Sequence, residues 1–313
     1  MNLITNWLDI RFANSVRIRG IGLSERCPVG CSHCGISLTP TGYKMTFSDL
    51  QRIIAFEDLK LDKKVFVSFG DPLYYRDDGK DVSDVVSLLL GRGVERVRIV
   101  TTGFNPDQHA ILKTVKSLAQ YKGKVECILS FNLFQRNPQD TARKVVHTIE
   151  TLSEVGVPVG LDGTYSLENK EETDKELARV IDILREHKRK PPPSDMGQIS
   201  RVGRAKDVTA HEFNPETPKR SCCIHSGSGG RRLTINPRGD LLPCTTITAN
   251  ISWSVANVFE HTWEGIAARY KDYIEQHERH QRMRPEGVTR CVWHHSFEFK
   301  PPAPKKAHLR ARA

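Results

Sequence analysis

Three cysteines stand close together near the start of the chain, in the segment ERCPVGCSHC, which contains Cys27, Cys31 and Cys34. Pro28 and Gly30 favour tight turns, so one short loop can wrap around a metal centre. Iron-sulfur centres normally take four protein cysteines. A loop with only three thiolates therefore indicates a four-iron cluster with one iron left open for an exchangeable ligand.

The spacing of these cysteines, three residues and then two, resembles the CxxxCxxC motif of the radical S-adenosylmethionine (SAM) superfamily. In that family the open iron chelates the amino and carboxylate groups of SAM, and an electron from the cluster releases a 5′-deoxyadenosyl radical. The resemblance implies a 4Fe-4S cluster on Cys27, Cys31 and Cys34, with SAM as the second cofactor. A tetrahedral zinc site that includes His33 is the alternative that these residues alone leave open.

Two further segments resemble the family's SAM-binding motifs. VSFGDPLYY resembles the Gly-Gly-Glu motif, whose backbone holds the amino group of SAM; Gly70 and Asp71 match its last two positions, and phenylalanine replaces the first glycine. ILSFN carries Ser130 and Asn132 where the family places polar side chains on the ribose hydroxyls, although such residues also occur at strand ends facing solvent. The resemblance also places His33, just before the third cysteine, near the adenine.

Short β-branched runs alternate with longer helical stretches, which is typical of βα units around a parallel sheet. Six units fit either an open doubly wound sheet or an incomplete barrel, and both gather their chemistry at the carboxyl ends of the strands. We expect an α/β fold: a partial (β/α)6 TIM-like barrel of parallel strands with a small cysteine-containing C-terminal extension. The expected strands are 16–23, 64–69, 96–101, 125–131, 157–161 and 198–202, and the expected helices are 46–56, 82–92, 108–120, 141–155 and 170–188.

The composition changes after residue 204 to a texture rich in Gly, Pro and Cys. RRLTINPRGDLLPC predicts a β-hairpin that turns at Asn236 to Asp240. We therefore expect a radical SAM partial barrel over residues 1–205, an auxiliary iron-sulfur domain over 206–300, and a basic disordered tail over 301–313.

The stretch from Cys223 to Cys244 resembles the start of the SPASM or twitch extension of the superfamily, in which a hairpin with Gly-x4-Cys and later cysteines bind an auxiliary 4Fe-4S cluster. The resemblance implies a second cluster on Cys223, Cys244 and Cys291. Cys222 is an alternative to its neighbour, because adjacent side chains in an extended chain face opposite ways. No CxxCxxxxxC follows, so two auxiliary clusters are not expected. The other interpretations are that these thiols bind nothing, or that Cys222 or Cys291 is catalytic and returns hydrogen to a product radical.

The charge and hydropathy of the chain restrict its partners. The 313 residues include 47 Lys and Arg against 37 Asp and Glu, a net charge of +10 that would attract an anionic substrate, a nucleotide or nucleic acid. Part of this excess lies in the solvated stretches HKRK and PPAPKKAHLRARA. No apolar run approaches the roughly 18 to 20 residues that span a bilayer, and the N-terminus lacks a secretory signal, so we expect a cytoplasmic protein with no membrane partner.

The motifs do not identify the substrate. Our leading hypothesis is hydrogen abstraction from a small biosynthetic molecule, such as a sugar, aminocyclitol or nucleoside, giving dehydrogenation, epimerisation or rearrangement by an oxidoreductase or isomerase. Peptide maturation is the alternative enzyme function, because the extension is common among peptide maturases, although no extra domain precedes the first strand. RNA modification rests on charge alone. A non-catalytic, zinc-stabilised nucleic-acid-binding protein is the alternative of another class. The segment HERHQRMR could contact a flavodoxin or ferredoxin that donates the electron.

Overall fold

The computed structural model describes residues 16–32, 34, 38–56, 58–134, 141–166, 168–198, 231–243 and 254–282. In these residues the chain forms an α/β fold around one sheet with the strand order β6-β5-β4-β3-β2-β1-β7-β8-β9. The expected α/β partial barrel is confirmed. None of the helices in the described ranges is long and apolar enough to cross a membrane.

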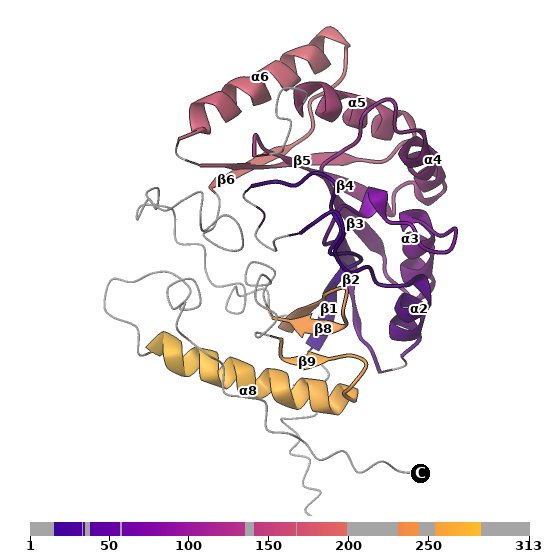
Figure 1. The fold of residues 1–313 in the computed structure, drawn as a ribbon, viewed down its shortest axis with the longest axis vertical. Coiled ribbons are helices and arrows are strands. Elements are labelled where there is room, and N and C mark those ends of the chain that lie inside the picture. The colour runs from indigo at the N-terminus through magenta and orange to yellow at the C-terminus, as the bar shows by residue number, and fades with distance from the viewer. Residues whose placement is uncertain are drawn as a thin grey trace, which may run out of the picture.

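The strands β1 to β6 are parallel, and the helices that connect them lie on the outer side of the curved sheet (Figure 1). The six strands are β1 (Val16–Gly22), β2 (Leu61–Ser68), β3 (Arg96–Thr101), β4 (Val125–Phe131), β5 (Val159–Tyr165) and β6 (Ser194–Gln198). The helices are α2 (Phe47–Ala55), α3 (Val82–Gly91), α4 (His109–Leu118), α5 (Thr141–Glu154) and α6 (Lys170–Glu186), with short 3-10 turns η1 (Pro72–Tyr74) and η2 (Ala119–Tyr121).

The central strands β2, β3 and β4 bury alternate residues against the helices, as the two-residue period of a strand requires. In β2, Val65 and Val67 are fully buried in the core, whereas Phe66 between them is only half-buried on the opposite, inner face. Cys127 is fully buried within β4 as a small residue of the core. The helices therefore cover the outer face of the sheet, and the opposite, inner face carries partly exposed side chains such as Phe66.

The predicted boundaries differ from the structure mainly where a strand is polar. β2 begins at Leu61 rather than 64. Its first residues, LDKK, are mostly charged, so the apolar pattern that predicts a strand starts only after them. β5 runs to Tyr165 rather than 161, since its last part, DGTY, lacks an apolar alternation. β6 begins at Ser194, where it pairs with Leu161, and not at 198; residues 199–202 lie outside the described part of the chain.

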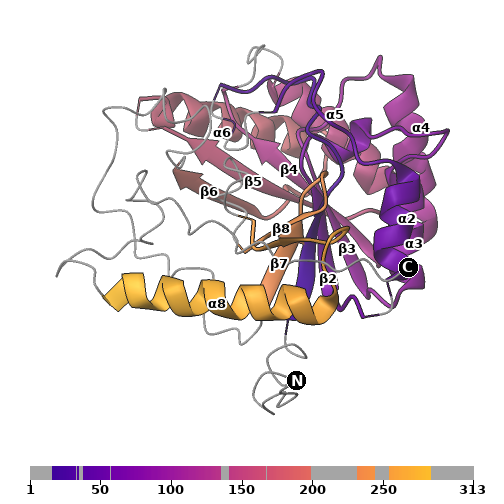
Figure 2. The same ribbon diagram turned by 60° about the horizontal axis from the view of Figure 1, so that its bottom comes forward.

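The C-terminal elements continue the same sheet. β7 (Arg231–Ile235) pairs in parallel with β1 and forms an antiparallel hairpin with β8 (Asp240–Leu242), which confirms the predicted turn. β9 (Ala256–Asn257) follows, and α8 (Trp263–Arg282) packs beside the hairpin (Figure 2). The predicted domain boundary at residue 205 lies outside the described residues.

Candidate active site

The cysteine loop leaves β1 at the carboxyl end of the parallel strands. Cys27 is buried, Cys31 and Cys34 are partly exposed, and none of the three is in a disulfide. The Cys27 amide donates to the carbonyl of Thr39 at 2.9 Å, and the Cys34 amide donates to the carbonyl of Cys31 at 3.3 Å. The Leu38 amide donates to the Cys34 Sγ at 3.4 Å. The loop is thus folded on itself, and its three thiols form no disulfide bond. His33 lies outside the described residues.

The electrostatic surroundings of these thiols are mixed. Burial raises the pKa of Cys27 to about 11, and the nearby Asp71 adds to the shift. Lys144, on α5, lies in the field of Asp71, Cys31 and Cys27, although burial lowers its pKa. A metal must therefore displace the thiol proton of Cys27, which metal coordination does readily.

The described residues contain no group of three His, Cys, Asp or Glu side chains placed to hold a single metal ion. A four-iron cluster needs a different arrangement of ligands from a single metal ion. Its irons occupy alternate corners of a cube, and each thiolate binds a separate iron. Three thiols spread along one loop, with Cys27 buried and Cys31 and Cys34 partly exposed, fit that donor set.

The cysteine loop is fastened to the end of β4 through main-chain and amide contacts. The Phe134 carbonyl accepts from the Ser32 amide at 3.0 Å and from the Ser32 hydroxyl at 3.4 Å. The Phe134 amide in turn donates to Asn132 Oδ1 at 3.2 Å. Asn132 is 1% exposed, and its Nδ2 is buried without a hydrogen-bond partner in the described structure. A buried amide donor without an acceptor is costly, so this nitrogen is suited to a bound ligand.

Ser130 and Asn132 both occupy the carboxyl end of β4, as predicted. Ser130 is half-buried on the inner face of the sheet, opposite Asp162 of β5 in register. Both residues therefore lie at the same end of the parallel sheet as the start of the cysteine loop.

Asp71 is buried and ties the ends of β2 and β3 together. Its Oδ1 accepts from the Thr101 hydroxyl at 2.6 Å and from the Leu73 amide at 3.2 Å. Its Oδ2 accepts from the Thr102 amide at 2.8 Å and the Thr102 hydroxyl at 2.6 Å. Burial raises the pKa of Asp71, and the hydrogen bonds from both threonines oppose that shift. The carboxylate is thus occupied within the protein, and it is the main chain beside it that faces the loop.

The main chain before Asp71 adopts an unusual conformation. Phe69 and Gly70 both have positive φ, 61° and 66°. A Cβ on Gly70 would lie 2.4 Å from the Arg26 carbonyl oxygen and 2.8 Å from that of Ser24, both in the cysteine loop. Only glycine allows this approach, and the strained phenylalanine beside it is the kind of outlier that gathers at functional sites.

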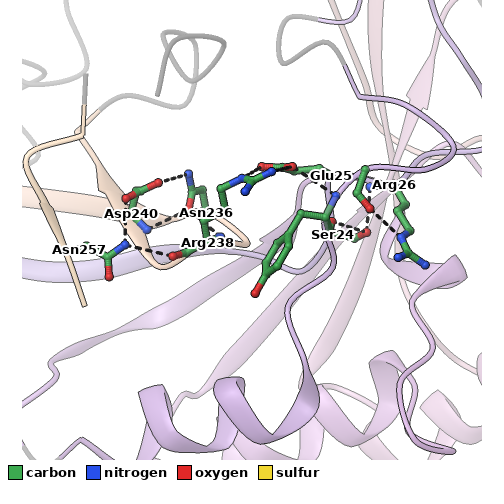
Figure 3. Close-up of polar contacts among 9 residues, drawn as sticks. Ser24, Glu25, Arg26, Asn236, Arg238, Asp240 and Asn257 are labelled. Carbon is green, nitrogen blue, oxygen red and sulfur yellow. Dashed lines mark hydrogen bonds and ion pairs between the residues drawn. The ribbon is translucent and has the colours of Figure 1, made fainter. Parts of the chain in front are cut away.

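The hairpin also contacts the cysteine loop, as Figure 3 shows. Arg238 donates from Nε and from an Nη to the Glu25 carboxylate at 2.7 and 2.8 Å, and its guanidinium lies 4.9 Å from the centre of the Tyr43 ring. Asn236 shapes the turn, since its Oδ1 accepts from the amides of Arg238 and Asp240, each at 2.9 Å. The C-terminal extension is thereby held against the loop that carries Cys27.

Sequence reasoning missed several of these residues. Lys144, Thr101 and Thr102 carry no motif, although the Thr-Thr pair at the end of a strand is a polar signal of the kind used for β4. The pair of Glu25 and Arg238 joins positions 213 residues apart, so no local pattern reveals it. The predicted ligands and thiols of the extension, Cys222, Cys223, Cys244 and Cys291, lie outside the described residues.

The family model of the radical SAM superfamily matches residues 21–185, which include the cysteine loop, Gly70, Asp71, Ser130 and Asn132. This match covers more than half of the chain. The chain belongs to the radical SAM superfamily, and this family implies SAM and a 4Fe-4S cluster as cofactors. No curated protein matches the chain.

Solved structures with bound S-adenosylmethionine share the fold. Streptococcus suis SuiB bound to the precursor peptide SuiA is similar with a TM-score of 0.56 and 15% identity, over 87% of this chain and 69% of that one. The native anSMEcpe with bound AdoMet and the Cp18Cys peptide is similar with a TM-score of 0.57 and 12% identity, over 83% and 82%. SuiB bound to SAM is matched over 63% of its length, less than two thirds. At these identities the likeness establishes the fold.

Proposed function

We propose that this protein cleaves SAM reductively and uses the resulting radical to abstract hydrogen from a C-H bond of a peptide substrate. The observation that carries the reaction class is the loop of three cysteines outside any disulfide at the carboxyl end of β1, within a family match. The peptide takes precedence over the small molecule expected above because two solved structures that share the fold, those of SuiB and anSMEcpe, hold a bound peptide. A sugar, aminocyclitol or nucleoside remains the second candidate.

The residues of the loop would hold the cluster. Cys27, Cys31 and Cys34 would each ligate one iron, leaving the fourth iron for SAM. When bound, the cluster supplies the electron that splits SAM into methionine and the 5′-deoxyadenosyl radical.

The neighbouring strand ends would position SAM. The main chain at Gly70 is held against the loop by the occupied Asp71 carboxylate, so its polar groups are fixed for the amino group of SAM. Asn132 Nδ2 would donate to a ribose hydroxyl, which would satisfy a buried donor that has no partner in the described structure. Ser130, from the same strand edge, would add a second ribose contact. His33 would lie near the adenine.

We also keep the auxiliary cluster as a proposal, with residues 206–300 as its domain. Its support is the Gly-x4-Cys spacing from Gly239 to Cys244 and the confirmed hairpin that precedes this cysteine. A protein with both clusters holds about eight irons. An iron content near four that does not change when Cys244 and Cys291 become Ala would remove the second cluster. A flavodoxin or ferredoxin is the proposed electron donor.

The reaction and the substrate class can be tested together. Anaerobically reconstituted protein is reduced with dithionite, supplied with SAM, and assayed for 5′-deoxyadenosine with and without size-selected extract of the source cells. We expect extract to stimulate the release, and protease treatment of the extract to abolish that stimulation. Stimulation that survives the protease would replace the peptide by the small molecule. Colourless zinc-loaded protein that releases no 5′-deoxyadenosine would contradict the reaction itself.

A further inference from the structure

The inner face of the sheet carries a compact group of charged side chains around one aromatic ring. Arg19 of β1 and Arg98 of β3 each place the guanidinium carbon 5.0 Å from the centre of the Phe66 ring. Phe66 is the register partner of both Gly20 and Arg98, so the three strands lie side by side here. We use the name arginine cluster for Arg19, Asp62, Lys64, Phe66, Arg98, Glu126 and Arg232.

The carboxylates of the arginine cluster are already occupied by other cations. Glu126 accepts from Arg98 Nε at 2.7 Å and also pairs with Lys64. Asp62 pairs with Arg232 Nε at 2.9 Å. The cluster therefore contains four cations and two carboxylates, and three of the cations account for both carboxylates.

Arg19 is the cation that remains. Among the described residues it makes no hydrogen bond or ion pair. Its guanidinium contacts the Phe66 ring and interacts electrostatically with its charged neighbours. Burial lowers the pKa of Arg19, Arg232 and Arg98 lower it further, and Asp62 opposes them. A guanidinium with five N-H donors is thus held among like charges without an oxygen acceptor from the described residues.

The backbone places Arg19 in this position by an irregularity. The register of β1 against β7 shifts between Ile18 and Gly20, so Arg19 is the extra residue of a β-bulge. Bulges re-aim side chains and are frequent beside active sites. The faces of a parallel sheet are usually apolar, so a bulge that presents an arginine with no oxygen acceptor among the described residues calls for a reason other than packing.

The arginine cluster lies below the cysteine loop along the same strands. Phe66 precedes the strained Phe69 by three residues, which corresponds to roughly 10 Å at the rise of a β-strand. A substrate that reacts at the carboxyl edge and reaches down the inner face would meet Arg19. This span equals about three residues of extended peptide.

We propose that Arg19, supported by the Phe66 ring and flanked by Arg98 and Arg232, binds an oxyanion group of the substrate, a carboxylate or a phosphate. The inference rests on the proposed function, because it supplies a substrate subsite for that enzyme. A guanidinium fork fits either oxyanion with two parallel hydrogen bonds, and the surplus of positive charge supports the complex.

The test measures binding of two probes to the anaerobic holoenzyme by titration calorimetry at constant ionic strength. The probes are inorganic phosphate and a blocked Glu-Glu dipeptide, with a blocked Gln-Gln dipeptide as the neutral control. The variants are Arg19→Gln and a matched control, Arg179→Gln, which removes the same charge from exposed α6. A third variant, Phe66→Leu, keeps every charge and removes the ring.

We expect one oxyanion probe to bind wild type and Arg179→Gln alike, and to bind Arg19→Gln roughly tenfold or more weakly. The probe that binds identifies phosphate or carboxylate as the source. Phe66→Leu should weaken binding by about two- to fivefold, because the aromatic ring on which the Arg19 guanidinium lies is lost. Equal binding by wild type and Arg19→Gln, binding of Gln-Gln as strong as Glu-Glu, or binding of neither oxyanion would overturn the proposal.

Two controls separate this proposal from its basis. Arg19→Gln should melt at or above the wild-type temperature, since it relieves repulsion between guanidinium groups; a clear fall in Tm would mean that Arg19 holds the fold and would contradict the inference. 5′-Deoxyadenosine release is measured on the same wild-type preparation. Release without Arg19-dependent binding refutes the anion subsite alone, whereas Arg19-dependent binding without release refutes the proposed reaction alone.

Discussion

Gly70 combines a left-handed backbone conformation with a close approach to the cysteine loop. Its φ of 66° is left-handed, and a Cβ there would lie 2.4 Å from the Arg26 carbonyl oxygen in the cysteine loop. Gly79 offers a matched control, because its φ of 72° is also left-handed while nothing lies within 4 Å of its added Cβ. Comparing Gly70→Ala with Gly79→Ala therefore isolates the contact with the loop from the cost of the backbone conformation.

The expected magnitudes follow from these contacts. A left-handed alanine costs about 1–2 kcal/mol at either site. At Gly70 the Arg26 carbonyl must also retreat by about 1 Å to reach the ordinary contact distance of 3.4 Å, and such overpacking costs about 1–3 kcal/mol more. We expect Gly79→Ala to lower Tm by roughly 2–8 °C and Gly70→Ala by roughly 4–20 °C. A shift of about 1 Å in the loop should also cost on the order of 100-fold in SAM cleavage.

The assay compares both variants with wild type after identical anaerobic reconstitution. Iron content, Tm and the rate of 5′-deoxyadenosine release under dithionite are measured on each preparation. Gly79→Ala should keep wild-type iron content and release, and Gly70→Ala should lose most of the release. If the two variants lose the same Tm and retain the same rate, the close approach of the strand end to the cysteine loop is not important for the site.

Three further changes test the contacts around the loop. Thr102→Val removes one hydroxyl donor from the Asp71 carboxylate and should destabilise the protein by about 1.5–3 kcal/mol, measured as a fall in Tm; an unchanged Tm would contradict the network. Asn132→Leu should raise the Kd for SAM about tenfold, since the unpartnered amide donor is lost, and an unchanged Kd would exclude it as a ligand. A double-mutant cycle of Glu25→Gln and Arg238→Gln should give a coupling energy of about 1 kcal/mol, and additive changes in Tm would show that the pair does not hold the hairpin.

The parts of the fold that are periodic could be predicted from the sequence. β3 and β4 match their predicted bounds, because each is a short run rich in β-branched and apolar residues whose burial alternates along its whole length. The ends of β2 and β5 could not be predicted, since the inner face of the sheet carries charged and small residues there instead of apolar ones. α8 was not predicted as an element, because the second half of its sequence, EQHERHQR, is polar throughout and shows no apolar periodicity.

The candidate site divides in the same way. A short motif reveals residues that lie together in the sequence, such as Cys27 and its two neighbours in the loop. The contacts that hold this loop in place come from distant segments: Phe134 reaches it from β4, and Arg238 reaches it from the hairpin. The arginine cluster was foreseen only as an excess of charge, since its members come from five strands and meet only through the register of the sheet.

In the proposed function, the thiolates of Cys27, Cys31 and Cys34 hold a 4Fe-4S cluster whose open iron binds SAM. The most direct test of this claim is the amount of 5′-deoxyadenosine that reconstituted, dithionite-reduced protein forms from SAM, beside a variant in which Cys27, Cys31 and Cys34 are all Ala. We predict that the native protein forms this product, and that the variant forms none and holds about four fewer irons. If the native protein forms no product, and the variant keeps the same iron content and colour, the claim is wrong.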